Sequence, residues 1–443
     1  MAKTADELAG LIRGDFLRDA RKEWARLRWL QKNIDGGLNK TWMPENADLE
    51  YRDLFRKARS PWLRFVRDCI AQGLIVDGYT HNDIWLDAWQ ENGMDGRQGQ
   101  VTREAIGLGY SFVLSLPAVG GGVVMRPLSA TRTFMSKADP WDEFPDLVLH
   151  RVADKKWMAV DNEAVYRFEG DPEHIGEMDV TRHDLGFVPV AMVPNSYATD
   201  GYPESEIEPA IPVYKRIVDA TFTLQMVQRY GAFPQKNMAG GSIATDADGN
   251  ALIRPAVDSL LHSTDPLTKF GSFPAADLDK VSSSVDTHIK HLSAVCQVPP
   301  HYLLGSVVNM SAEGIAAAES GYFRNIDDHK VVMGEGYELA LRSAAAILGS
   351  DAADDTAAEI HWRDTSTRSL AQTSDAVVKL ATVGAPLEML FALIPGWSKS
   401  DAIEAAEHVR SNGSQSLPEA IQANAQKAVD GFRGLELPVE GDQ

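Results

Sequence analysis

Cysteine is scarce in this 443-residue chain, and long apolar runs are missing. Cys69 and Cys296 each stand alone, far apart in the sequence. We therefore expect neither a disulfide framework nor a thiolate metal site, and a reducing cytosol suits the composition. No apolar run of about 18 residues occurs, which predicts no membrane span. The first residues also lack the layout of a signal peptide. Thr4-Ala5-Asp6-Glu7 instead has the capping-box pattern that begins a helix.

The motifs of common enzymes are absent as well. The sequence contains no Gly-x-x-x-x-Gly-Lys-Ser/Thr loop, so the chain is not a P-loop ATPase, and any DNA-moving motor must be a separate protein. It has no His-Glu-x-x-His motif, no paired Cys-x-x-Cys motifs and no Gly-x-Ser-x-Gly elbow. His288 and His291 lack a third ligand at a helical step and are interpreted as a surface or interface pair. We predict no catalytic residues, no metal site and no cofactor, and a mechanical rather than a chemical function.

Acidic residues are in excess, and their distribution along the chain is uneven. The formal net charge is −20, but residues 1–70 hold 15 Lys/Arg against 11 Asp/Glu. A chain this acidic does not bind nucleic acid by the usual neutralisation of phosphates. Solubility is one explanation. The other is a surface that lets DNA pass without holding it, because like charges repel.

Apolar periodicity in the first half predicts helices followed by strands. Helices are expected at 6–33, after Ser60-Pro61 with the serine as cap, around 84–89 and near 98–108, with a short strand at 74–76. Period-two patterns separated by Gly-, Pro- and Asp-rich turns then predict an antiparallel block. Its strands are expected at 110–116, 122–126, 147–152, 156–160, 164–168 and 187–193. The expected fold class is α+β, mostly helical.

Three helical segments organise the second half. Pro209 and Pro212 begin a helix with a heptad-like apolar seam from Val213 to Val227, typical of packing within a bundle or between subunits. A second helix, at 275–297, carries an apolar stripe of Val281, Val285, Ile289, Leu292 and Cys296. A third begins after Ser311 and continues to about Leu348, roughly 55 Å at 1.5 Å per residue. Its glycines, at 314, 321, 334 and 336, are expected to let it kink. Further helices are expected at 367–383, 399–411 and 417–431.

The order of these segments resembles the portal proteins of tailed bacteriophages, over about residues 5–410. The most specific stretch is 291–305, which contains Val298-Pro299 and ends in Leu303-Leu304-Gly305. A turn of this Val-Pro-x-x-x-Leu-Leu-Gly form is followed by Ser311-Ala312-Glu313 and the long helix. Weaker matches lie at 60–79, 89–93, 105–113, 362–364 and 379–380.

The resemblance implies a portal-type fold that forms a ring with an axial channel. It places a wing of helices and an antiparallel β block at 1–203, a first stem helix at 204–231 and a clip at 232–274. A second stem helix at 275–297 and a tunnel loop at 298–310 follow, and 311–443 holds the long kinked helix, the crown and a C-terminal tail.

The resemblance also implies partners and a place of action. The chain would form a homo-oligomer, usually a dodecameric ring, at one vertex of the capsid in the virion, assembled in the cytoplasm of the bacterial host. Double-stranded DNA would pass through it without sequence specificity during packaging and ejection. Other implied partners are the terminase large subunit, the head-completion adaptor, and the scaffold and major capsid proteins. No membrane partner is implied.

Two sets of residues are the candidate DNA-facing sites. On the 275–297 helix, the face opposite the apolar stripe carries Lys280, Ser283, Thr287 and Lys290. We hypothesise that this face lines the channel and that its two lysines contact phosphates weakly and transiently. A solvated helix face without a role is the alternative. In the tunnel loop, Ser306, Val307, Val308 and Asn309 are small, neutral groups suited to passing DNA. An ordinary interhelical loop is the alternative there.

Two other classes of function remain open from the sequence. One is an acidic intracellular hydrolase that uses carboxylates, which predicts a monomer with a deep, charged cleft. The other is a helical adaptor or scaffold protein that binds partners without forming a channel. Ring formation distinguishes the portal hypothesis from both of these alternatives.

Overall fold

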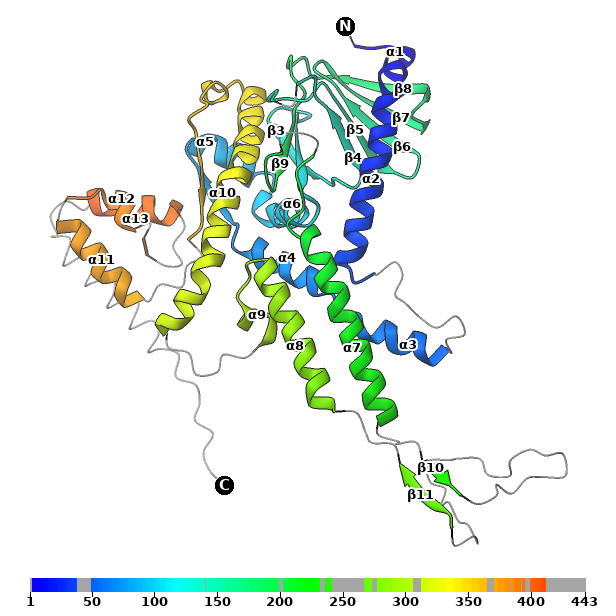
Figure 1. Ribbon diagram of the computed structural model, residues 1–443. Coiled ribbons are helices and arrows are strands. Elements are labelled where there is room, and N and C mark those ends of the chain that lie inside the picture. Colours follow the sequence, from blue (N-terminus) through cyan, green and yellow to red (C-terminus); the bar gives the residue numbers. More distant parts are fainter. Residues whose placement is uncertain are drawn as a thin grey trace, which may run out of the picture.

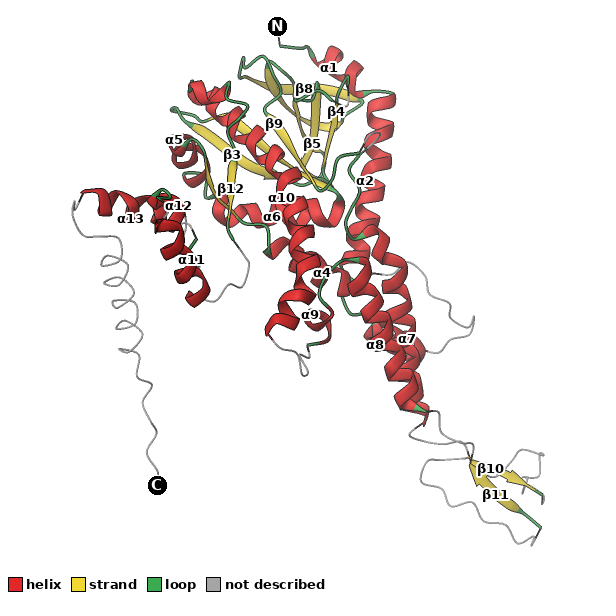
Figure 2. Ribbon diagram, turned by 60° about the vertical axis from the view of Figure 1, so that its left-hand side comes forward, coloured by secondary structure: helices red, strands yellow, loops and turns green. Residues whose placement is uncertain are grey.

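The computed structural model of the chain (Figures 1 and 2) consists of a body of strands and helices from which a helical hairpin projects. It describes residues 2–37, 49–139, 141–198, 202–231, 236–240, 267–272, 277–305, 312–364, 370–382, 384–391, 393–394 and 399–411. Every structural statement below concerns these residues.

The N-terminal helical region is two helices rather than the single one predicted at 6–33. The predicted capping box is confirmed: Thr4 accepts from the Glu7 N–H, and the Glu7 carboxylate accepts from the Thr4 N–H. It begins α1 (Ala5–Ile12), and Gly14 separates α1 from α2 (Asp15–Ile34). Gly14 has φ +79°, a conformation that glycine adopts without steric cost.

The next helices follow the predicted order with local corrections. α3 (Leu49–Ala58) and α4 (Trp62–Gln72) come first. The predicted Ser60 cap is wrong, because Pro61 occupies the N-cap position of α4 without a side-chain hydrogen bond. β1 (Val76–Tyr79) begins later than predicted. The predicted helix around 84–89 is α5 (Asn82–Ile84) continued by a π-helical turn, η1 (Trp85–Gln90), and α6 (Met94–Leu108) follows.

The predicted antiparallel block forms two sheets. β2 (Tyr110–Pro117) is the central strand of a three-stranded sheet, between β3 (Val123–Leu128) and β9 (Val190–Pro194). The other sheet has five strands in sequence order: β4 (Thr133–Ser136), β5 (Leu147–Ala153), β6 (Lys156–Val160), β7 (Ala164–Asp171) and β8 (His174–Arg182). All six predicted strands are present. β4 and β8 were not predicted, since β4 is only four residues long and most of β8 is exposed.

The second half of the chain supplies the hairpin and the longest helix. A 3₁₀ turn, η2 (Glu208–Ala210), leads into α7 (Ile211–Gly231), as Pro209 and Pro212 predict. α8 (Leu278–Val295), the short α9 (Pro300–Leu304) and α10 (Ala312–Leu348) follow, and η3 (Asp351–Ala353) comes next. α10 continues as one helix through its glycines for 37 residues. Two further strand pairs are antiparallel: β10 (Lys236–Ala239) with β11 (Lys269–Ser272), and β1 with β12 (Ile360–Trp362).

The predicted C-terminal helices at 367–383 and 399–411 correspond to α11 (Leu370–Thr382) and α13 (Lys399–Ser411). A short helix, α12 (Leu387–Phe391), lies between them and packs against α13. The helix predicted at 417–431 lies outside the described residues.

Two hydrophobic cores hold the body together. The larger core joins the three-stranded sheet to α4, α6, α7 and α10, and its largest fully buried side chains are Trp89, Tyr110, Tyr214 and Tyr337. The smaller core packs α1 and α2 against the five-stranded sheet, with Leu8, Ile12 and Tyr166 fully buried. In Figure 1, α2 and α10 lie on opposite sides of the strand layers.

Candidate functional site

The candidate site is the hairpin of α7 and α8, which lie side by side and extend away from the body (Figure 2). Burial along the predicted apolar stripe of α8 decreases toward the tip. Ile289, Leu292 and Cys296, nearest the body, are buried, whereas Val281 and Val285 are only partly buried. The seam of α7 behaves in the same way, with Val213 and Ile217 buried and Leu224 and Val227 partly exposed. The tip of the hairpin therefore leaves apolar surface available for a neighbour.

The predicted polar face of α8 is exposed along its whole length. Lys280, Ser283, Thr287 and Lys290 are all solvent-exposed. The Thr287 hydroxyl donates to the Ser283 carbonyl oxygen at 2.8 Å, which leaves small and locally satisfied groups between the two lysines. The helix therefore presents the face that the sequence predicts, and whether this face lines a channel stays a prediction.

The two lysines of this face are not equivalent. Lys280 Nζ lies 3.1 Å from Asp277 Oδ2, and Asp277 also caps α8 by accepting from the Lys280 N–H. Lys290 has no ion pair in the part of the chain that the structure describes. The charge of Lys280 is therefore offset locally, whereas that of Lys290 is available to an external anion. Asp277 is not among the predicted site residues, although an acidic residue three positions before a lysine is a recognised helical pair.

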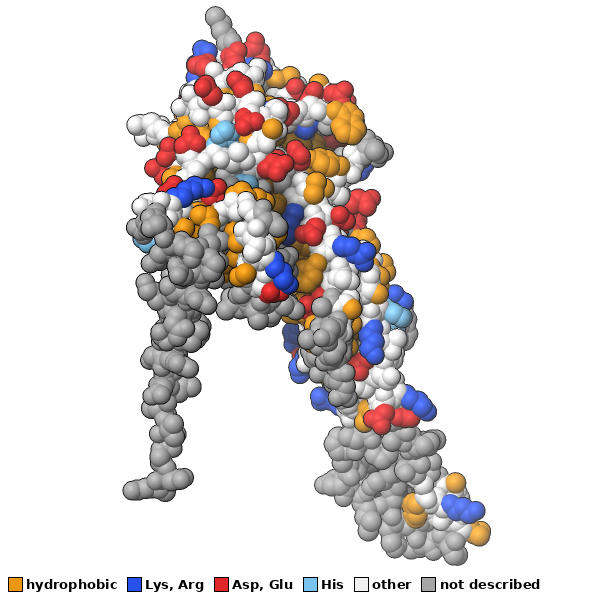
Figure 3. Space-filling view, turned by 90° about the vertical axis from the view of Figure 1, so that its left-hand side faces the viewer, with side chains coloured by type: hydrophobic (Ala, Val, Ile, Leu, Met, Phe, Trp, Pro, Cys, Tyr) orange, Lys and Arg blue, Asp and Glu red, His pale blue; other side chains and the backbone are white. Residues whose placement is uncertain are grey.

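The hairpin is close to neutral, although the whole chain is strongly acidic. α7, α8 and the Asp277 cap together hold five Lys/Arg and four Asp, whereas the whole chain has a net charge of −20. In Figure 3, Lys and Arg side chains occur along the projecting hairpin, whereas Asp and Glu predominate on the body. The hairpin therefore repels a polyanion less than the chain as a whole does.

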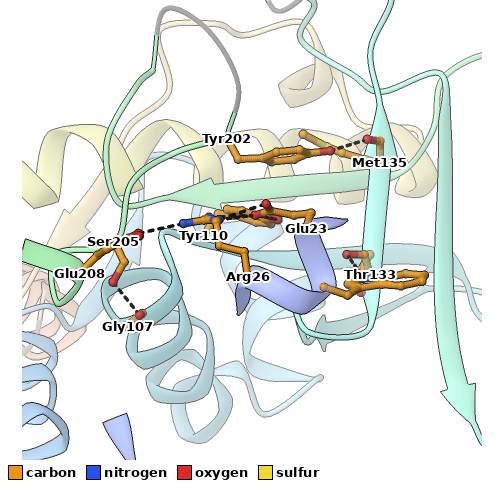
Figure 4. A network of polar contacts seen from close by, with 10 residues as sticks. Glu23, Arg26, Gly107, Tyr110, Thr133, Met135, Tyr202, Ser205 and Glu208 are labelled. Carbon is orange, nitrogen blue, oxygen red and sulfur yellow. Dashed lines mark hydrogen bonds and ion pairs between the residues drawn. The ribbon is translucent and has the colours of Figure 1, made fainter. Parts of the chain in front are cut away.

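A partly buried polar network fixes the base of the hairpin to the N-terminal helices (Figure 4). Arg26 on α2 forms ion pairs with Glu23 at 2.8 Å and with Glu208 of η2 at 3.0 Å. The Tyr110 hydroxyl donates to Glu23 at 3.0 Å. Burial alone would lower the pKa of Arg26, but hydrogen bonds to Glu23 and the charges of both carboxylates raise it. Since η2 leads directly into α7, this network sets the direction in which the hairpin leaves the body.

Ser205 completes this attachment, since its hydroxyl donates to the Gly107 carbonyl oxygen at 2.7 Å and joins the segment before η2 to α6. At the other side of the same region, the Tyr202 hydroxyl donates to the Met135 carbonyl oxygen at 2.9 Å. Both contacts are drawn in Figure 4. The base of the hairpin is therefore held by α2, α6 and β4 together.

The end of α8 nearest the body turns sharply into α9. The Ser293 hydroxyl donates to the Val298 carbonyl oxygen at 2.6 Å, and Gln297 adopts a positive φ of 51°. The predicted tunnel-loop residues Ser306, Val307, Val308 and Asn309 lie outside the described residues. A buried carboxylate joins α9 to α10 beyond them. Glu319 Oε1 accepts from the Tyr302 hydroxyl at 2.9 Å and lies 3.3 Å from His301 Nε2.

The structure offers little for redox or metal chemistry. Burial raises the pKa of Cys296 to about 12 and that of Cys69 to about 11, so both thiols stay protonated at neutral pH. Within the described ranges, no group of three or more His, Cys, Asp or Glu side chains is placed to hold a metal ion. No helix among these residues is long and apolar enough to cross a membrane.

Comparison with known sequences decides the family. Residues 75–416 match the family model described as "Phage portal protein, SPP1 Gp6-like". The chain belongs to this family. The portal protein of Mycobacterium phage L5 is 28% identical over 351 residues, which cover 72% of this chain and 71% of the L5 protein. The portal protein of Mycobacterium phage D29 is 32% identical over 210 residues, or 45% of this chain and 43% of the D29 protein.

Membership confirms the resemblance to portal proteins and answers part of the functional question. The chain is a structural, non-enzymatic component of the phage virion in the head-to-tail connection. The hydrolase alternative is therefore set aside.

Chains in solved structures of gene transfer agent (GTA) particles align with most of this chain. One is a chain from the virion of the native particle, with a TM-score of 0.46, 13% identity, and coverage of 83% of this chain and 99% of that chain. Another is from the neck of the native particle, computed with C12 symmetry, with a TM-score of 0.47, 14% identity, and coverage of 82% of this chain and 98% of that chain.

Proposed function

We propose that about twelve copies of this chain form a ring whose axial channel is lined by the α7–α8 hairpin. Double-stranded DNA would pass through this channel during packaging and ejection. The observation that carries the proposal is the exposed face of α8: small polar groups and a single uncompensated lysine, on a nearly neutral hairpin of a chain with a net charge of −20. Few fixed cations mean weak contacts with phosphates and hence little friction along the duplex.

The same proposal names the other regions. Residues 1–203 form the wing, 204–231 and 275–297 the stem, and 232–274 the clip. The tunnel loop is 298–310, and 311–443 holds the long helix, crown and tail. The half-buried apolar stripes near the hairpin tip would be covered by the stems of neighbouring copies. The terminase large subunit, the head-completion adaptor, and scaffold and capsid proteins are the proposed partners.

Ring formation is tested first on the purified chain, by negative-stain microscopy and mass photometry. We expect rings with a central hole, at about twelve times the mass of the chain. If the chain stays monomeric alone, the measurement is repeated after co-expression with scaffold. A chain that is monomeric in both cases contradicts the proposal and favours an adaptor that forms no channel.

The channel contact is tested by charge reversal on α8. We expect Lys280→Glu with Lys290→Glu to reduce DNA packaging about tenfold while rings still form, because added negative charge repels phosphates. Lys290→Glu alone should account for most of the loss, since Lys280 is already paired with Asp277. Lys156→Glu, on the exposed surface of the five-stranded sheet, is the matched control. Packaging by the double variant at the wild-type rate would show that this face does not meet DNA.

A further inference from the structure

An exposed aromatic pair borders a hollow beside α10. The hollow has a volume of about 390 Å³ and is lined by the loop between β4 and β5, the segment around β9, and α10. Trp141 and Tyr197 lie at its margin with 78% and 62% of their surface exposed. Val331, on α10, is 71% exposed. Large side chains this exposed are typical of binding surfaces.

The same face carries acidic side chains that form no ion pair with the two cations lining the hollow, Lys137 and Arg342. Asp328 and Glu335 on α10 are exposed and have no ion pair among the described residues. Burial first, and then the charges of Glu335 and Glu359, raise the pKa of Glu338. Burial first, and then the charges of Glu335 and Glu338, raise the pKa of Tyr197. Arg342 is already engaged by Glu143, and Lys137 Nζ donates to the Asp142 carbonyl oxygen. Figure 3, which views the side of the molecule that carries α10, shows acidic and exposed hydrophobic side chains together on the body.

We call Trp141, Tyr197, Val331, Glu335 and Glu338 the acidic-aromatic face. An aromatic ring beside an unneutralised carboxylate suits the cationic head of an arginine or lysine. The guanidinium can stack on the ring while its N–H groups donate to the carboxylate. The face therefore selects for a basic partner surface.

A basic stripe of matching form lies on α2, on the other side of the strand layers (Figure 1). The stripe consists of four exposed residues spaced four, three and four positions apart along the helix: Arg21, Ala25, Arg28 and Lys32. Arg21 reaches Glu173 at 2.8 Å, whereas Arg28, in the middle of the stripe, has no ion pair within the described ranges. Arg21 and Arg28 are seven residues apart, like Asp328 and Glu335. Seven helical residues span about 10.5 Å, so the charges of the two helices can align.

We propose that the acidic-aromatic face binds the basic stripe of α2 on a second copy of the chain. Two different surfaces on opposite sides of one molecule make a head-to-tail contact, which closes into a ring when the rotation between copies allows it. This proposal rests on the proposed function and extends it, because it identifies the surfaces through which neighbouring wings contact each other. An isolated ion pair on a protein surface contributes little to the free energy of binding. In the proposed contact, Trp141 and Tyr197 cover the ion pairs and shield them from water, which strengthens them, and the pairs are repeated around the ring.

Charge exchange tests the contact. Glu335→Lys and Arg28→Glu are made separately and together in the full chain, and the fraction assembled into rings is measured by mass photometry. We expect each single variant to lower that fraction about tenfold. The double variant restores attraction with reversed signs, and we expect its assembly to return to within about twofold of wild type. Glu91→Lys, an exposed acidic residue after η1, is the matched control and should assemble normally.

The outcomes separate this contact from the proposed ring. Circular dichroism and thermal unfolding are used to check that each variant is folded. We expect that they all are, because both substituted positions lie on the surface. Wild-type rings that tolerate both single reversals overturn the contact and leave the ring in place. Single variants that fail without recovery in the double variant also overturn the pairing. A wild-type chain that never assembles, even with scaffold, overturns the ring itself.

Discussion

Glycine at position 336 sets how closely α10 approaches the three-stranded sheet. A Cβ atom added at Gly336 would lie 2.6 Å from the Met192 carbonyl oxygen and 2.7 Å from Val193 Cα, both in β9. These are backbone atoms, which cannot move aside without displacing the strand. The sequence predicts a point of flexibility at Gly336, whereas the structure gives this glycine a packing role. Gly321, in the same helix, has nothing within 4 Å of the added Cβ position.

The two glycines therefore predict opposite effects of one substitution. Gly336→Ala should destabilise the protein by about 2–3 kcal/mol, because it overpacks the contact between α10 and β9. Gly321→Ala should stabilise it by up to about 1 kcal/mol, because alanine favours the helix. Urea unfolding of both variants measures the two changes in free energy. Equal effects at both positions would show that helix propensity, and not the close approach of β9, governs Gly336.

His150 is the residue whose titration should be most visible in stability. Its Nδ1 lies 2.8 Å from the Thr133 hydroxyl, between β5 and β4. Burial first, and then the charge of Arg132, lower its pKa from 6.5 to about 4. Since the unfolded chain binds this proton at higher pH, the contribution of His150 to stability is complete above pH 6.5 and is lost as the pH falls toward 4.

We expect His150 to account for about 1–2 kcal/mol of the stability lost between pH 7 and pH 5. His150→Gln keeps a hydrogen-bonding group but removes the titration, so its stability should change less over the same interval. Chemical denaturation of both proteins at the two pH values gives the difference. Identical pH dependence in wild type and variant would mean that His150 titrates normally in the folded protein.

At the scale of elements, Glu319 joins α9 to α10 across the residues that separate them. Its side chain is 8% exposed, and it is held by Tyr302 and His301 from α9. The Tyr322 hydroxyl, one turn further along α10, donates to the Cys69 carbonyl oxygen at 2.6 Å and ties the same region to α4. Removing the carboxylate would leave buried polar groups on α9 without their acceptor.

Glu319→Ala should therefore destabilise α9 locally, by about 1–3 kcal/mol. Hydrogen exchange should become faster in 300–304 and in the first turns of α10, and stay unchanged in the five-stranded sheet. Tyr302→Phe removes one of the two contacts and should have a smaller effect at the same place. Ser320→Ala, at the neighbouring exposed position, is the control. Unchanged exchange in α9 would show that its apolar contacts alone hold it.

Elements with strong periodicity could be predicted from the sequence, and those without it could not. α8 and α10 were predicted to within a few residues, because their apolar stripes are continuous. A regular helix was predicted where the π-helical turn Trp85–Gln90 lies, since the edge-to-face contact of Trp89 with Tyr337 of α10, with ring centroids 5.5 Å apart, is a tertiary contact that local periodicity does not show. The polar face of α8 followed from helical geometry alone.

At the scale of the whole molecule, the long-range contacts were beyond local patterns. β1 pairs with β12, where Tyr79 faces Ile360. The network at the base of the hairpin likewise joins Arg26, Tyr110 and Glu208, which are far apart in the sequence. No periodicity reports such pairings, because they depend on how the whole chain closes. The hairpin and its polar face could thus be predicted from the sequence, but the contacts that fix the direction of the hairpin could not.

The continuity of α10 has a mechanical consequence. One end of this 37-residue helix is fastened next to α9 by Glu319, and the other is buried against the sheet at Tyr337, Leu341 and Ala344. An unbroken helix resists bending, so a push at its first turns displaces the far end instead of being absorbed between them. α10 therefore forms a rod about 55 Å long. We expect strain imposed beside the hairpin to reach the opposite end of the body through this helix.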